Sequence, residues 1–142
     1  GKAIVEFANK IGAGIGCSFM GLSAIPQEYE RFLGMQGMHG HYASSMSMHN
    51  ADCIIALGAR FNDRVTGNRA KFATTAKIVH IDIDAAEINK NIKTDAFIVG
   101  DLKQVLMSAM EALAAERLPL LSNRSLQFFP HPLVVKVAQA QN

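Results

Sequence analysis

The chain has 142 residues, of which 49% are hydrophobic and 18% are charged, and its formal net charge is +2. This length suits one domain, and the composition supports a hydrophobic core and excludes a disordered tail. The basic residues are scattered, so we expect no nucleic-acid groove and no membrane binding; no apolar run approaches the ~20 residues of a membrane span. Cys17 and Cys53 lie in apolar runs, which is typical of buried free thiols in a reducing compartment such as the cytoplasm.

The first third of the chain predicts a helix, a short strand and a glycine-rich loop. Apolar residues recur at helical spacing over residues 2–11, and no strand precedes this helix, so the chain looks like part of something longer. A strand is expected over 15–20. Residues 33–40 contain Gly34, Gly37 and Gly40, which indicates a loop that turns tightly or approaches a ligand closely. A helix is expected over 41–50.

Strands then alternate with helices along the chain. We expect strands over 53–57, 77–84 and 96–99, and helices over 66–72, 85–91 and 102–117. This alternation predicts an α/β fold with a doubly wound parallel sheet flanked by helices. After Pro119 the pattern weakens, so residues 1–118 are expected to form the domain. Residues 119–142 are expected to form a tail or diverged linker with one short helix over 133–138.

Polar residues and glycines follow several of the expected strands. In a doubly wound sheet the carboxyl ends of the strands meet at one edge, where ligands bind. Arg60 and Arg64 follow the strand 53–57, and two guanidinium groups there suit an anionic or phosphate-bearing ligand. The alternative is a solvated charged loop in which the arginines pair with Asp63, an interaction worth little at a surface.

Three aspartates have two interpretations each. Asp82 and Asp84 follow a strand, where an acidic side chain can bind a ribose hydroxyl, and Asp101 follows Gly100 before the longest helix. Asp84 and Asp101 can instead cap the N-terminus of a helix. We favour capping for Asp84, leave ligand contact and capping equally open for Asp101, and leave open whether Asp82 contacts a ligand.

Several common motifs are absent from the sequence. It contains no G-x-G-x-x-G turn, no P-loop, no nucleophile–base pattern, and no histidines at metal-ligand spacing. We therefore assign no catalytic residue and no metal ligand. The residues alone predict an α/β domain that binds a nucleotide-like anion.

Five segments taken together resemble a known family. They are Gly37-Met38-His39-Gly40, Met48-His49-Asn50-Ala51-Asp52, Gly58 to Asn68, His80-Ile81-Asp82-Ile83-Asp84, and Val99-Gly100-Asp101. In order and spacing they resemble the central domain of the acetohydroxyacid synthases (acetolactate synthases), which are thiamine-diphosphate enzymes. The resemblance covers roughly residues 1–115.

The resemblance implies a place in a larger enzyme. Members of this family have three α/β domains; the outer two bind thiamine diphosphate and magnesium, and the middle one, a six-stranded parallel sheet, binds FAD. They join two pyruvates, or pyruvate and 2-ketobutyrate, with loss of carbon dioxide, in branched-chain amino-acid biosynthesis. FAD has a structural role there and undergoes no net redox change.

The resemblance also implies site residues. Met38 should reach toward the substrate channel, and Arg64 should orient a keto-acid carboxylate. The residues expected to contact FAD are Ser18, Phe19, Gly37, Met38, His39, Gly58, Ala59, Arg60, Asn62, Arg64, Val65, Asp82, Ile83, Gly100 and Asp101.

The sequence departs from the family pattern in three ways. Asn62 stands where the family usually has aspartate. The first strand of the middle domain with its glycine-rich turn, and the residues that bind thiamine diphosphate and metal, are missing, so the chain alone should be inactive. The alternatives are a stand-alone nucleotide-binding or assembly module without catalysis, and a remnant that binds nothing.

The missing first strand also bears on partners. It should leave an open place in the sheet that invites pairing with another chain, which predicts a homo-oligomer. The other partners implied are the remaining synthase domains and a regulatory subunit.

Overall fold

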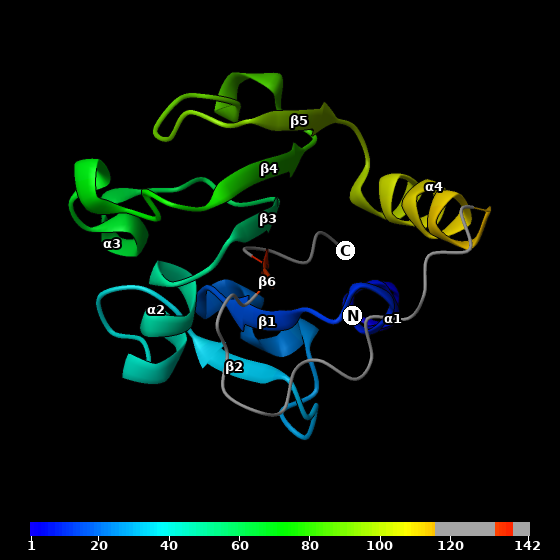
Figure 1. Ribbon diagram of the computed structural model, residues 1–142, viewed down its shortest axis with the longest axis horizontal. Helices are drawn as coiled ribbons and strands as arrows, with labels where there is room; N and C mark the ends of the chain where they lie inside the picture. Colours follow the sequence, from blue (N-terminus) through cyan, green and yellow to red (C-terminus); the bar gives the residue numbers. More distant parts are fainter. Residues whose placement is uncertain (116–132, 138–142) are drawn as a thin grey trace.

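A sheet of six parallel strands in the order β2-β1-β6-β3-β4-β5 forms the centre of the part that the computed structural model describes, residues 1–115 and 133–137 (Figure 1). The strands are β1 (Gly14–Cys17), β2 (Phe32–Met35), β3 (Cys53–Leu57), β4 (Lys77–Asp82), β5 (Ala96–Val99) and β6 (Leu133–Val137). The prediction of an α/β fold with a doubly wound parallel sheet is confirmed.

Helices cover both faces of the sheet. The α-helices are α1 (Lys2–Ile11), α2 (Tyr42–His49), α3 (Asp63–Thr66) and α4 (Leu102–Ala115), and the short 3₁₀ helices are η1 (Phe19–Ala24), η2 (Arg69–Lys71) and η3 (Ala85–Glu87). Figure 1 shows α1 and α4 next to each other on one face, and α2 and α3 on the other. The sheet is therefore the middle layer of three.

Successive residues of β3 point to opposite faces of the sheet, as the period of a strand requires. Leu57 packs on the side of α1 and α4, in a core cluster that includes Phe7 and Leu106. Ile54 packs on the opposite side against Met48 of α2. A strand buried on both faces needs a continuous apolar run, which the segment from Cys53 to Leu57 provides.

Helix α1 forms where the apolar spacing predicted it. Ile4, Phe7 and Ala8 are buried. The helix ends at Gly12, whose φ of 69° is left-handed, and the N–H of Ala13 donates to the carbonyl of Ala8 at 2.8 Å. This is a glycine cap that satisfies carbonyls at the end of a helix.

The predicted helix over 133–138 is wrong: Leu133–Val137 is strand β6 and lies between β1 and β3. The segment is mostly valine, and β-branched residues favour a strand over a helix. Its Val135 pairs with Ile15 on one side and Ile55 on the other. The place that we expected to be open is filled by the chain's own residues, so another chain cannot pair there.

Other elements differ from the prediction in their limits. The strand expected over 15–20 ends at Cys17 and is followed by η1, and the loop expected over 33–40 begins with β2, which was missed. The helices expected over 66–72 and 85–91 are much shorter, as α3, η2 and η3. Residues 116–118 of the predicted domain, which include the end of the last predicted helix, and residues 119–132 and 138–142 of the predicted tail lie outside the described residues.

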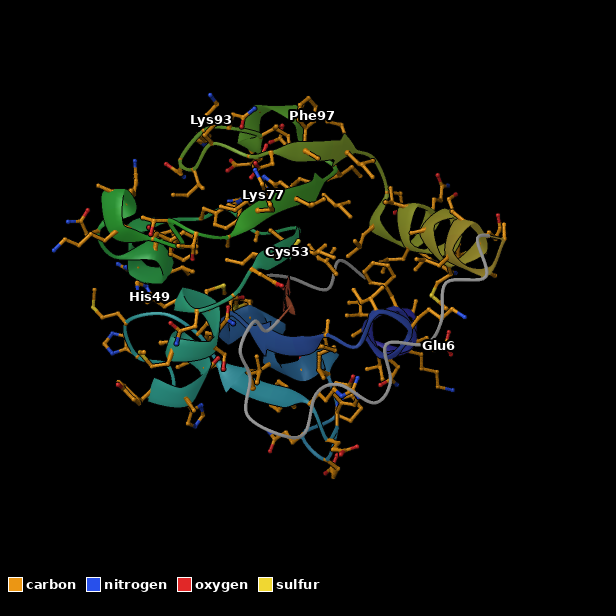
Figure 2. The ribbon with its side chains drawn as sticks, in the orientation of Figure 1. Glu6, His49, Cys53, Lys77, Lys93 and Phe97 are labelled. Carbon is orange, nitrogen blue, oxygen red and sulfur yellow. The ribbon has the colours of Figure 1, made fainter. Side chains whose placement is uncertain are left out.

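Strand β5 forms one edge of the sheet and is exposed along its length. The ring of Phe97 on this strand is 55% exposed and points outward (Figure 2). Across the described residues, none of the helices combines the length and apolar character needed to cross a membrane.

Candidate functional site

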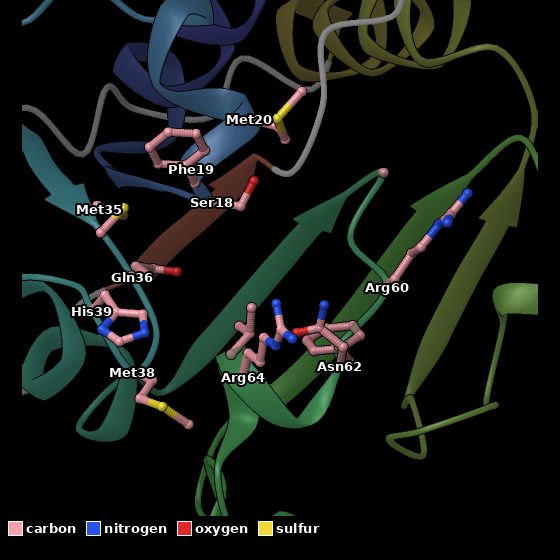
Figure 3. A pocket seen from close by; sticks show the side chains of 13 residues that line it. Ser18, Phe19, Met20, Met35, Gln36, Met38, His39, Arg60, Asn62 and Arg64 are labelled. Carbon is pink, nitrogen blue, oxygen red and sulfur yellow. The ribbon is translucent and has the colours of Figure 1, made fainter.

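A cavity of about 480 Å³ lies at the carboxyl ends of β1, β2 and β3 (Figure 3). These strands flank the point where the chain changes direction across the sheet, which is where open α/β sheets bind ligands. The cavity is lined by Ser18, Phe19, Met20, Met35, Gln36, Met38, His39, Gly58, Arg60, Phe61, Asn62, Arg64 and Val65. More than half of the residues that the family resemblance predicts to contact the cofactor therefore line this one cavity.

A second cavity, of about 540 Å³, lies at the carboxyl ends of β3, β4 and β5, below the start of α1 and α4. Asp82, Ile83, Gly100 and Asp101 line it, as do Gly58 and Arg60. Gly58 and Arg60 thus belong to both cavities. The two cavities are therefore neighbours that share these two residues as part of their walls.

The loop after β3 is held in a special backbone conformation. Gly58 has a φ of 62°, and its N–H donates to the carbonyl of Ile81 at 2.8 Å. Phe61 has a φ of 46°, a left-handed conformation that is uncommon for a residue with a side chain. Its buried ring packs edge-to-face against His80 at 5.2 Å between centroids, which holds the strained loop in place.

The two loops that face the first cavity are joined through their backbones. The N–H of Met38 donates to the carbonyl of Arg64 at 2.8 Å. Gly37 has a φ of 103°, and a Cβ on this residue would lie 2.8 Å from the same carbonyl oxygen. Only glycine permits both the conformation and the approach.

Arg60 and Arg64 extend from the loop as exposed side chains. Within the described residues, neither arginine takes part in an ion pair closer than 4.0 Å. The alternative of pairing with Asp63 is wrong, because neither arginine forms an ion pair with its carboxylate. That carboxylate instead accepts from the backbone N–H of Arg64 at 3.1 Å. Both guanidinium groups can therefore bind an anion.

The three aspartates differ in the backbone N–H groups that they bind. Asp84 accepts from the N–H of Ala86 at 2.9 Å, so the capping prediction is confirmed. Asp101 also caps, accepting from Gln104 at 3.0 Å, while it lines the second cavity. Asp82 is only 8% exposed, and its carboxylate accepts from the N–H of Asp84 at 2.9 Å.

Two predicted residues lie apart from these cavities. Gly37 lines a smaller neighbouring cavity of about 240 Å³. Ala59 is fully buried and lines none of the three. Both shape the loops that carry the other site residues.

Sequence reasoning missed Gln36, which follows β2 and lines the first cavity. Its side chain is 5% exposed. The feature of the sequence that could have pointed to Gln36 is Gly16 on the neighbouring strand, where a Cβ would overlap the Gln36 amide. Without the strand β2 the two residues could not be placed side by side.

Cys17 precedes the first cavity, but its thiol is not a nucleophile. The side chain is fully buried, and burial raises the pKa of Cys17 to about 12. The thiol therefore stays protonated at neutral pH. Among the described residues, no group of three or more His, Cys, Asp or Glu side chains is placed to hold a metal ion.

A parallel sheet with cavities and unpaired arginines at its switch point is typical of α/β domains that bind nucleotide-like anions. Residues 1–109 match the family model for the central domain of thiamine pyrophosphate enzymes. The chain therefore belongs to this family.

Similar proteins from bacteria and archaea agree with this assignment. Over 115 residues, 81% of this chain and 20% of the relative, the chain is 47% identical to the acetolactate synthase isozyme 3 large subunit of Escherichia coli (strain K12). It is 44% identical over 114 residues, 80% of this chain and 19% of the relative, to the probable acetolactate synthase large subunit of Methanocaldococcus jannaschii. The chain spans about a fifth of the length of these relatives.

Proposed function

We propose that this chain is the central domain of an acetolactate synthase large subunit and that its two neighbouring cavities bind FAD. The observation that carries the proposal is that Gly58 and Arg60 line both cavities. A dinucleotide has two ring systems separated by phosphates. Two cavities with a cation between them fit that shape and charge.

The residues of the site divide among the parts of this ligand. Phe19, Met38 and His39 in the first cavity would contact the flavin ring, with Ser18 and Asn62 at its rim. Arg60 would bind the phosphates. Asp82, Ile83, Gly100 and Asp101 in the second cavity would contact the adenosine end.

Arg64 has a further role in this proposal. Its guanidinium lines the first cavity beside Met38 and has no ion-pair partner among the described residues. It would bind and orient the carboxylate of a keto acid. Bound FAD would have a structural role, holding the residues around the first cavity in place. It would undergo no net redox change.

The whole enzyme would join two pyruvates into 2-acetolactate with release of carbon dioxide. Other domains would hold thiamine diphosphate and magnesium, since this chain spans only about a fifth of the length of the acetolactate synthase relatives. This chain alone would then be inactive. A cytoplasmic location and a regulatory subunit are further parts of this proposal. Homo-oligomer formation is also part of it, through contacts other than strand pairing between β1 and β3.

A second candidate is a stand-alone nucleotide-binding module without catalysis. Strand β6 favours it, because the chain completes its own sheet between β1 and β3. Both candidates require nucleotide binding. They differ in whether other synthase domains bind to this one.

Titration of FAD into the purified chain, followed by flavin fluorescence, tests the proposal. We expect saturable binding that Arg60→Ala weakens about ten-fold or more, the effect of losing a charge-assisted hydrogen bond. The matched control is Arg69→Ala, because Arg69 is also exposed but lines none of the three cavities. A folded wild-type chain that binds no FAD, or equal weakening by both variants, would contradict the proposal.

A further inference from the structure

Gln36 carries a buried side-chain amide without a partner. The side chain is 5% exposed, and neither its nitrogen nor its oxygen has a hydrogen-bond partner among the described residues. Buried polar side chains are normally paired, because an unpaired one loses its hydrogen bonds to water. An amide left in this state is an indication of a ligand.

The amide is fixed in place by the strands around it. The backbone N–H of Gln36 donates to the carbonyl of Cys17 at 2.8 Å, which anchors the residue to the end of β1. Its side chain lies against Gly16, where a Cβ would overlap the amide nitrogen. Figure 3 shows this side chain pointing from the end of β2 into the cavity, toward the space between Ser18 and Arg64.

The rest of this cavity suits a flat ring. Phe19, Met20 and Met38 line it and are 74%, 62% and 72% exposed, so three large apolar side chains face open space. Aromatic and thioether groups pack well on ring faces. Gln36 is placed to contact the polar edge of a ring whose faces these residues cover.

We propose that Gln36 is a flavin-binding residue that recognises the imide edge of the ring; this inference rests on the proposed FAD site. A carboxamide offers an acceptor and a donor side by side. Its oxygen accepts from the ring N3–H, and its NH₂ donates to an adjacent ring carbonyl. The pair selects a ring with a donor and acceptor on one edge.

The test compares FAD with its N3-methyl derivative on the full chain. Gln36→Met keeps the length of the side chain and removes the amide. The matched control is Gln104→Met, the same change at an exposed glutamine that lines none of the three cavities. We expect the wild type and the control to bind FAD about ten-fold tighter than the methyl derivative. Gln36→Met should bind both equally weakly, and its ligand-free form should melt at a higher temperature because no amide is buried unpaired.

The outcomes separate this inference from the proposed function. If Gln36→Met binds FAD as tightly as the wild type, or if methylation weakens binding equally in both, the role of Gln36 is wrong and the FAD site stands. If the folded wild type binds no FAD while Gln36→Met still melts higher, the proposed function itself is wrong and the role of Gln36 fails with it.

Discussion

Single residues set the geometry of the site through the backbone. Gly37 allows the loop after β2 to approach the carbonyl of Arg64, and Gly16 allows the Gln36 amide to lie on β1. Replacing either glycine would move the lining side chains of the first cavity. Both glycines matter because a Cβ would displace the group beside it, the Arg64 carbonyl at Gly37 and the Gln36 amide at Gly16.

Cys17 predicts a loss of stability in alkaline solution. Its pKa is raised from 9.0 to about 12 by burial, so above pH 9 the unfolded chain releases a proton that the folded chain keeps. The unfolded state then binds fewer protons, and the free energy of unfolding falls by up to about 1.4 kcal/mol per pH unit. Urea unfolding at pH 8 and pH 10.5 measures this fall.

The control for this prediction is Cys17→Ala, which lacks the thiol. This variant is expected to be less stable at both values because it leaves a cavity, but its stability should fall less between them. Identical falls in the two proteins would show that Cys17 does not titrate on unfolding.

Helices α1 and α4 stabilise the fold and also enclose the second cavity. Residues of both helices, including Ile4 and Leu106, line that cavity and belong to the larger core cluster. The adenosine end of the proposed site therefore depends on how these two elements pack.

Leu106→Ala should lower the free energy of unfolding by about 3 kcal/mol, because the side chain is 2% exposed and its removal leaves a cavity. Met107→Ala is the matched control, since the neighbouring side chain is 53% exposed. Its effect should stay within about 0.5 kcal/mol. Urea unfolding of both variants checks the prediction, and similar losses would mean that α4 does not pack as described.

The sequence was sufficient for elements with a strong periodic pattern. Helices α1 and α4, and strands β3 and β5, lie where apolar spacing placed them. Strand β2 was missed because Gly34 lies within it and weakens the strand signal. The Gln36 site was missed with it, since a contact across two strands depends on their register.

The sheet as a whole is divided by β6. Strands β1 and β2 lie on one side of it, and β3, β4 and β5 on the other. The first cavity takes residues from both sides, including Ser18 after β1 and Gly58 after β3. The lateral order could not be predicted, because the pairing of Val135 with Ile15 joins residues far apart in the sequence.

Strand β6 should therefore hold the two parts of the candidate site together. Val135→Pro removes a backbone N–H from a strand paired on both sides, which a central strand does not tolerate. We expect a loss of about 3 kcal/mol or more in the free energy of unfolding, and loss of FAD binding, measured by urea unfolding and by titration. Val135→Ile keeps the N–H and should retain both properties. If the proline variant has the same free energy of unfolding and the same affinity for FAD as the wild type, β6 does not join β1 to β3 in solution. Strands β1 and β3 must then be held together by other contacts.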